Sequence, residues 1–236
     1  MSSPLSPRPA VPAATPADDP HGGQPVRATG ARIADARVAV VMIHGRGASA
    51  ESILTLAPAL AAPGVAFLAP QAGGRQGSQW YPFGFMAPIA QNEPGITSGM
   101  RAIARVLDHV AAAGIPPERT LLLGFSQGAC LASEFVARHA RRYGGLAALS
   151  GGLIGPDGTP RDYAGALEGT PVFLGCSDVD GHIPAARVRE SAEVLRRLGG
   201  EVTMRLYPGM GHLVNDDEIA EVQRLIAGAL AVGGHE

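Results

Sequence analysis

The stretch that decides the fold reads Leu121-Leu122-Leu123-Gly124-Phe125-Ser126-Gln127-Gly128-Ala129-Cys130. An apolar run ends in the pattern Gly-x-Ser-x-Gly, and a segment compatible with a helix, 129–139, follows at once. Glycines two residues before and after Ser126 allow the end of a strand and the start of a helix to approach closely, where a side chain would collide. This strand–turn–helix context predicts a sharp turn that projects the serine hydroxyl beyond the edge of a sheet as a candidate nucleophile.

Short β-rich runs alternate with longer helical patterns through the rest of the chain. We expect strands at 24–32, 37–43, 65–69, 120–123, 145–149, 171–175 and 201–207, and helices at 51–62, 99–113, 129–139, 185–198 and 218–229. Such alternation predicts a mostly parallel α/β sheet. About twenty residues separate 145–149 from 171–175, which leaves no room for a cap domain between them.

Length and composition limit the domain organisation. The 236 residues fit one domain that can bury a sizeable core. Prolines at positions 4, 7, 9, 12, 16 and 20 lie among alanines and serines, so this segment has no apolar face to offset the entropy of ordering. We therefore expect a disordered Pro/Ala-rich tail over 1–20 and a single folded domain over 21–236.

Charge and cysteine content restrict the partners. Charged residues make up only 17% of the chain and the formal net charge is −2, so no basic surface for nucleic acid is predicted. No apolar run approaches the roughly 18 residues needed to span a bilayer, and the N-terminus lacks the pattern of a secretion signal. Cys130 and Cys176 are expected to be buried free thiols. These features favour a soluble cytoplasmic protein.

An unassisted serine is a poor nucleophile and needs a base, which in an open α/β sheet sits at the carboxyl end of a strand. Four of the seven histidines fall in predicted tails or helices, namely His21, His109, His139 and His235. His212 follows the last strand through a Gly-Met-Gly turn that can aim its imidazole at the sheet edge, so we expect it to be the base. His44 is expected to brace its own glycine loop, and His182 to be a pocket or surface residue.

The acid that orients this base should lie after the strand 171–175. Asp178 and Asp180 both stand there, and both satisfy the chain order Ser…Asp…His found in α/β-hydrolases. Their spacing does not choose between them. An oxyanion hole needs two main-chain N–H groups near the nucleophile. Gln127, at the start of a helix, should supply one, and Arg46 in the loop after an earlier strand should supply the other.

These motifs together resemble one known family, the phospholipase/carboxylesterase group of α/β-hydrolases, which includes bacterial carboxylesterases and acyl-protein thioesterases. The matching pieces run in the family's order from about residue 38 to the C-terminus: His44-Gly45-Arg46-Gly47, Ala69-Pro70-Gln71, Trp80-Tyr81-Pro82, Gly124-Phe125-Ser126-Gln127-Gly128, Asp178-Val179-Asp180-Gly181-His182-Ile183-Pro184 and Gly211-His212. The resemblance implies a compact α/β-hydrolase fold with helices flanking a mostly parallel sheet and no cap. It also implies a serine hydrolase that cleaves small to medium carboxylic esters without cofactor or metal.

The resemblance further implies which aspartate completes the site. The family's acid stands four residues before a proline, which maps onto Asp180, four before Pro184. Asp178 is then left in a supporting role. The match is not complete, since Gly181 stands where the family usually has proline. The implied catalytic residues are Ser126, Asp180 and His212, with oxyanion amides from Arg46 and Gln127, and homodimers occur in such families.

The segment 80–85 is expected to bound the substrate site. Four of the eleven aromatic residues fall there, which favours an apolar wall for a substrate; the alternative is that they only anchor a long connection to the core. The predicted pocket residues are His44, Trp80, Tyr81, Phe83 and His182. Three arginines that an anionic substrate could use, Arg46, Arg75 and Arg161, are interpreted instead as solvated surface side chains.

Other functions fit the sequence less well. Gly45-x-Gly47-x-x-Ala50 follows a strand and opens a helix, as in a dinucleotide-binding protein, but 65–71 lacks the acidic residue that would hold a ribose. A non-catalytic hydrolase-like module would not need all three triad residue types at strand ends. In dienelactone hydrolases the usual nucleophile is cysteine, whereas Ser126 stands at the turn here. An acyl thioesterase or a lysophospholipase would use the same triad.

Overall fold

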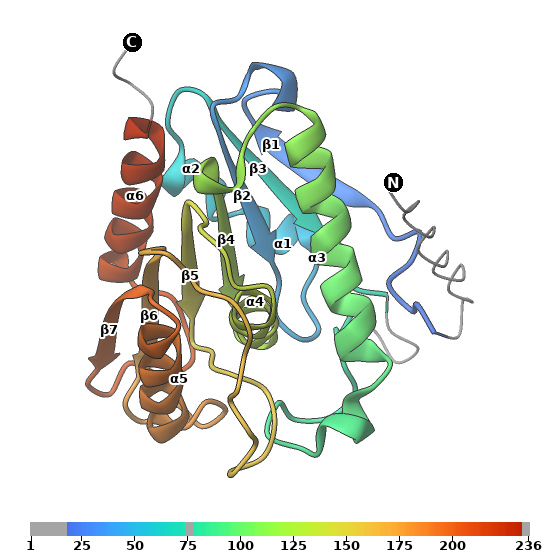
Figure 1. The fold of residues 1–236 in the computed structure, drawn as a ribbon, viewed down its shortest axis with the longest axis vertical. Coiled ribbons are helices and arrows are strands. Elements are labelled where there is room, and N and C mark those ends of the chain that lie inside the picture. The colour runs from blue at the N-terminus through green and yellow to red at the C-terminus, as the bar shows by residue number, and fades with distance from the viewer. Residues whose placement is uncertain (1–17, 74–77, 233–236) are drawn as a thin grey trace, which may run out of the picture.

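A computed structural model describes residues 18–73 and 78–232 (Figure 1). Within these residues, seven strands form one sheet in the order β1-β3-β2-β4-β5-β6-β7. Their bounds are β1 Val26–Gly30, β2 Val38–Ile43, β3 Val65–Pro70, β4 Thr120–Phe125, β5 Gly145–Leu149, β6 Pro171–Ser177 and β7 Glu201–Tyr207. Only β1 runs antiparallel to its neighbour, β3, and all other pairs are parallel. The predicted α/β sheet is therefore confirmed.

Helices cover both faces of the sheet (Figure 1). The helices are α1 Ala50–Leu54, α2 Ala57–Leu60, α3 Gly95–Ala112, α4 Gln127–Arg138, α5 Ala185–Arg197 and α6 Asp216–Ala231, with 3-10 turns η1 Ile33–Asp35, η2 Ile89–Asn92 and η3 Pro117–Arg119. Side chains of α3, α4 and α5 pack on one face, and those of α1, α2 and α6 pack on the other. In β2, Val41 points to the first layer and Val40 to the second, so a continuous apolar run is buried on both sides.

Two predicted helices differ from those observed by more than two residues at an end or in continuity. The helix expected at 51–62 is split into α1 and α2, because Pro58 lies in the first turn of α2 and lacks the N–H that a continuous helix would need. Helix α3 begins at Gly95, earlier than the expected residue 99. The carboxylate of Glu93 accepts hydrogen bonds from the N–H and the hydroxyl of Thr97, at 3.0 and 2.9 Å, and so caps the first turn.

His21 does not lie in a tail, so that interpretation was wrong. The side chain is buried, its Nε2 donates to the carbonyl of Trp80 at 2.8 Å, and its Nδ1 accepts from the N–H of Gly73 at 3.0 Å. Just before it, Asp19 accepts hydrogen bonds from Ser98 and Arg105 of α3, at 2.5 and 3.0 Å. Most of the predicted tail, residues 1–17, lies outside the described residues, as does His235.

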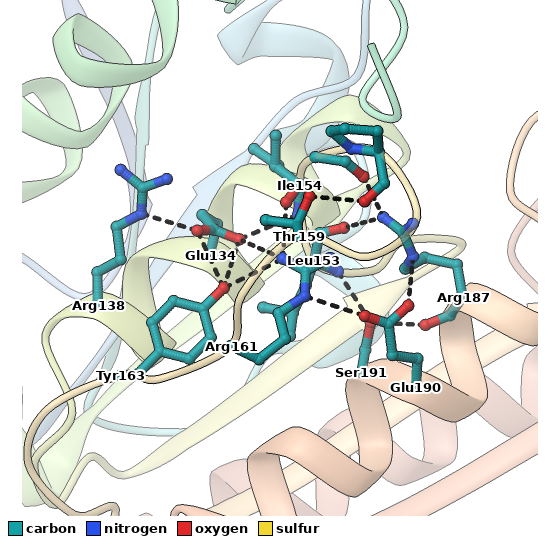
Figure 2. Close-up of polar contacts among 12 residues, drawn as sticks. Glu134, Arg138, Leu153, Ile154, Thr159, Arg161, Tyr163, Arg187, Glu190 and Ser191 are labelled. Atoms are coloured by element: carbon teal, nitrogen blue, oxygen red, sulfur yellow. Dashed lines mark hydrogen bonds and ion pairs between the residues drawn. The ribbon is translucent and has the colours of Figure 1, made fainter. Parts of the chain in front are cut away.

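The connection between β5 and β6 contains no cap domain and is held by buried arginines (Figure 2). Arg187 of α5, with a side chain only 1% exposed, donates from Nη1 to the carbonyls of Leu153 and Gly155 at 2.9 and 2.5 Å. The N–H of Gly155 in turn donates to the carbonyl of Phe85 at 2.8 Å. The connection is thereby joined to the segment 80–85, and the Arg187 guanidinium lies 5.8 Å from the Phe85 ring centre.

Figure 2 shows a second part of this network around Glu134 of α4. The Glu134 carboxylate accepts from the N–H of Ile154 at 3.0 Å and lies 3.8 Å from Arg161, which donates to the carbonyl of Ile154 at 2.7 Å. The Arg161 side chain is 7% exposed, so its interpretation as a solvated surface residue was wrong. The carbonyls of this connection have no strand partner, and buried carbonyls require donors. Arg75 lies outside the described residues.

No helix within 18–73 and 78–232 is long and apolar enough to cross a membrane.

Candidate active site

Ser126 stands between β4 and α4 in a strained backbone conformation. Its φ of 55° and ψ of −121° belong to a region that side-chain-bearing residues rarely occupy. The strain persists because the surrounding backbone is tightly packed. A methyl group added at Gly124 would collide with the carbonyl oxygen of Gly128, and one added at Gly128 would collide with that of Ile43. The two glycines of the Gly-x-Ser-x-Gly pattern therefore permit the turn that holds the serine.

Three side chains from different strand ends meet at this turn. The Ser126 hydroxyl lies 2.8 Å from Nε2 of His212, and Nδ1 of His212 lies 2.7 Å from Oδ2 of Asp180. Burial alone would raise the pKa of Asp180. Hydrogen bonds from His212 and from the N–H groups of residues 182 and 183, together with the charge of the imidazole, outweigh burial and lower the pKa of Asp180. An ionised Asp180 accepts Nδ1–H and leaves Nε2 free to take the serine proton.

Asp178 serves the neighbouring loop instead of the imidazole. Its side chain accepts a hydrogen bond from the N–H of Gly209 at 2.8 Å, and its own N–H donates to the carbonyl of Tyr207 at 3.1 Å. These bonds hold the start of the loop that carries His212. The structure thus brings Asp180, and not Asp178, to the imidazole.

Cys176 is a neighbour of the acid that the sequence did not single out for the site. Its sulfur lies 3.7 Å from Oδ2 of Asp180, the same oxygen that faces His212. Burial and the adjacent carboxylate raise the pKa of Cys176 to about 12, so the group stays a thiol and a weak donor to Asp180. Both cysteines are free and buried, as expected. The position of Cys176 at the end of a predicted strand, four residues before Asp180, is the sequence signal that could have placed it beside the acid.

The two predicted oxyanion residues line the same cleft as Ser126. Neither Arg46 nor Gln127 donates its main-chain N–H to an acceptor among the described residues. The turn that carries Arg46 touches the sharp turn at Ser126 between β4 and α4, here called the elbow, since a β-carbon on Gly45 would lie 3.4 Å from the β-carbon of Ser126. Unpaired N–H groups beside a nucleophile can stabilise the negative charge that develops on a carbonyl oxygen.

A cleft of about 310 Å³ opens at the serine. The residues that line it are Arg46, Tyr81, Gly84, Phe85, Ser126, Gln127, Cys130, His182, Ile183 and His212. Tyr81 and His182 were predicted as pocket residues. His182 packs edge-on against the imidazole of His212, with ring centres 4.9 Å apart. Gly84 and Phe85 belong to the segment 80–85 that was expected to bound the site, although neither was named as a pocket residue. Cys130 of α4 and Ile183 were not predicted to line the cleft.

Three predicted pocket residues lie elsewhere. Phe83 is 52% exposed on the surface, and His44 and Trp80 are buried behind the cleft wall. Trp80 donates from its indole N–H to the carbonyl of His44 at 2.8 Å. His44 accepts at Nε2 from the N–H of Ala72 at 3.1 Å and contacts the carbonyl of Gly45 through Nδ1 at 2.8 Å. Burial lowers the pKa of His44, so a neutral imidazole braces the loop.

Comparison with known proteins places this chain among esterases. A sequence model of the family described as phospholipase/carboxylesterase matches residues 27–230. A solved structure of a phospholipase/carboxylesterase from Dyadobacter fermentans is 39% identical, covers 87% of this chain and 97% of its own, and superposes with a TM-score of 0.81. A probable carboxylesterase of Oryza sativa subsp. japonica is 26% identical over 82% of this chain and 89% of its own length.

A further relative carries a different name. Acyl-protein thioesterase 1 of Gibberella zeae is 29% identical over 142 residues, which are 58% of this chain and 59% of that protein. The chain therefore spans about three-fifths of the length of this relative.

Proposed function

The chain belongs to the phospholipase/carboxylesterase family of α/β-hydrolases, and on that premise we propose that it hydrolyses carboxylic esters through an acyl-enzyme on Ser126. Residues 21–236 act as one catalytic domain. The observation that carries the proposal is the unbroken chain of contacts from the Ser126 hydroxyl to His212, at 2.8 Å, and from His212 to Asp180, at 2.7 Å. No cofactor takes part in the scheme.

In the first half of the reaction the Ser126 oxygen attacks the ester carbonyl carbon while His212 takes the hydroxyl proton. The bond between that carbon and the alkoxy oxygen then breaks, and His212 returns the proton to the departing alcohol. A water molecule repeats the sequence on the acyl-enzyme and releases the carboxylic acid and free Ser126. Asp180 holds the imidazole tautomer and stabilises its charged form throughout.

The main-chain N–H groups of Arg46 and Gln127 bind the oxyanion in both halves. Each donor of this kind contributes about 10²–10³ in turnover. The substrate is a small-molecule ester whose acyl part lies against Tyr81, Phe85 and Ile183 in the cleft. These side chains present mainly apolar surface, which suits a hydrocarbon acyl group.

A thioester is the second candidate substrate, because one relative is an acyl-protein thioesterase and the same triad attacks either carbonyl. A lysophospholipid is a third candidate, because the family's description also names phospholipases. We also propose that the protein acts in the cytoplasm, where its two free cysteines would stay reduced, and that it forms a homodimer, as members of such families do. Sedimentation of the purified protein tests the dimer.

The function is tested with a panel of chromogenic esters, acyl thioesters and a lysophospholipid of increasing chain length. Ser126→Ala should lower turnover of every hydrolysed substrate by at least about 10⁴-fold and abolish labelling by a fluorophosphonate. Asp180→Asn should cost about 10³–10⁴, while Asp178→Asn should cost far less. Retained turnover in the serine variant would overturn the scheme, and a larger loss from the Asp178 change would reverse the roles of the aspartates.

A further inference from the structure

The side chain of Arg46 makes several hydrogen bonds, while its main chain belongs to the turn 44–47 that is proposed to bind the oxyanion, here called the oxyanion turn. Its Nη1 donates to the side chain of Gln79 at 2.5 Å and to the carbonyl of Pro82 at 2.8 Å. Its Nη2 donates to the carbonyls of Tyr81 and Phe83 at 3.1 and 2.5 Å. Four acceptors thus use all four N–H bonds of the two terminal nitrogens, and three of the acceptors are successive main-chain carbonyls.

The guanidinium matches this convergence of carbonyls in shape. Three carbonyl oxygens turned toward one point repel each other less when donors stand between them, and a guanidinium offers planar, fixed N–H groups to all of them. Among the described residues, no carboxylate forms an ion pair with Arg46. Carbonyl dipoles therefore surround its charge. A lysine could not reproduce this arrangement, because its ammonium presents three donors from one point.

The clamped segment, residues 78–85, is also tied to the oxyanion turn at other points. The N–H of Gly47 donates to the carbonyl of Ser78 at 2.7 Å. The Gln127 side chain accepts from the N–H of Trp80 at 2.9 Å and donates to the carbonyl of Tyr81 at 2.8 Å. Hence both residues whose main chains are proposed to bind the oxyanion use their side chains to hold the same segment.

The same segment supplies one wall of the cleft, through Tyr81, Gly84 and Phe85. We propose that Arg46 is a positioning residue that determines acyl specificity: its guanidinium fixes the wall formed by residues 78–85 against the oxyanion turn. The inference rests on the proposed ester hydrolysis. An acyl chain long enough to touch Tyr81 and Phe85 then meets a preformed wall and does not have to order it, which lowers the cost of binding. An acetyl group is too short to gain from the wall.

The kinetic test compares acetyl, butyryl and hexanoyl esters of one chromogenic alcohol in Arg46→Met and Arg46→Lys. Both variants keep the main-chain N–H at residue 46. We expect KM for the butyryl and hexanoyl esters to rise about tenfold, the effect of losing a hydrogen bond to a charged group, and KM for the acetyl ester to change less than about twofold. Gln79→Ala, which removes only one acceptor, should cause a smaller change in the same direction. Arg32→Met, which removes an exposed arginine 3.4 Å from Asp35, is the matched control and should leave all three values unchanged.

Two kinetic results would overturn the proposal. An equal loss on all three esters would mean that Arg46 serves the oxyanion turn and not the acyl wall. A hemisuccinate ester of matched length is measured as well. If Arg46→Met lost activity only on this anionic ester and Arg46→Lys restored it, the charge at residue 46 would bind an anionic substrate and would not hold the wall.

A second measurement does not depend on activity. Trp80 is the single tryptophan of the chain and lies inside the clamped segment. Acrylamide should quench its fluorescence about twofold more efficiently in Arg46→Met than in the wild type or in Arg32→Met, and equal quenching in all three would show that no clamp exists. If the wild type cleaves no ester, the proposed function fails, and this quenching comparison still decides whether Arg46 holds the segment.

Discussion

The elbow at Ser126 is irregular backbone, and so are the cleft wall 78–85 and the connection 150–163, yet they are held in different ways. The elbow is held by close main-chain packing between a strand and a helix: Gly124 and Gly128 let main-chain atoms touch, and the Ser126 side chain makes no capping bond. The other two segments are held by arginine side chains that reach main-chain carbonyls. Arg46 donates to the wall 78–85, and Arg161 and Arg187 donate to the connection 150–163.

The difference follows from where the backbone polar groups find partners. At the elbow, β4 ends and α4 begins within one residue, so strand and helix satisfy almost every N–H and C=O. The segments 78–85 and 150–163 contain neither helix nor strand, and their carbonyls accept hydrogen bonds from arginine side chains. A turn between regular elements therefore depends on the absence of side chains, whereas an irregular segment depends on the presence of long ones.

The largest effect is expected at the elbow. Gly128→Ala would drive a methyl group into the carbonyl oxygens of Ile43 and His44, which are main-chain atoms of β2 and its loop and cannot move aside. We expect a loss of more than about 5 kcal/mol in the free energy of unfolding, together with loss of activity. Urea unfolding followed by circular dichroism measures it. Gly228→Ala in α6, where an added methyl group meets open space, is the control and should stabilise by about 0.5–1 kcal/mol. If both variants changed the free energy of unfolding only slightly, steric packing at Gly128 would not be what holds the elbow.

An intermediate effect is expected in the connection 150–163. Arg187→Met removes a buried cation and leaves the carbonyls of Leu153 and Gly155 without donors. The expected cost is about 3–5 kcal/mol in the free energy of unfolding. Arg189→Met, two residues along the same helix but exposed, should cost less than about 0.5 kcal/mol. Equal stabilities of the two variants, measured by urea unfolding, would contradict a role for buried arginines in holding the connection 150–163.

The smallest effect concerns a buried carboxylate that lacks such a cation. Glu218 of α6 is buried, and its Oε1 has no hydrogen-bond partner among the described residues, whereas Glu134 lies within 4 Å of two arginines. Burial raises the pKa of Glu218 from 4.5 to about 7, against the opposing effect of a hydrogen bond from Asn215. The folded state therefore keeps a proton that the unfolded state releases. Stability is fully present below about pH 4.5 and falls, by up to about 3 kcal/mol, as the pH rises to about 7.

Glu218→Gln should remove this part of the pH dependence, because the amide does not titrate. Urea unfolding at pH 5 and at pH 8 measures the difference for the wild type and the variant. A wild type whose stability falls no more steeply than that of the variant would show that Glu218 is not protonated in the fold.

Much of the fold follows from local sequence. The apolar runs predict each strand to within about two residues at either end, since a strand buried on both faces must be apolar throughout. The helix at 51–62 was predicted as continuous because its apolar spacing is helical, and Pro58 interrupts it. His21 was assigned to a tail because proline surrounds it in sequence, while its partners, Trp80 and Gly73, stand more than fifty residues away.

The elbow and the candidate residues Ser126 and His212 follow from the sequence alone, because a pattern of glycines and the ends of strands specify them within a few residues. Spacing left Asp178 and Asp180 equivalent, and only the folded loop brings one carboxylate to the imidazole. Only the tertiary structure shows that Arg46 donates to the cleft wall 78–85 and that Arg161 and Arg187 donate to the connection 150–163. Nothing local marks an arginine for such a role, because its partners are carbonyl oxygens, which every residue carries, and only the packed chain brings those oxygens within reach.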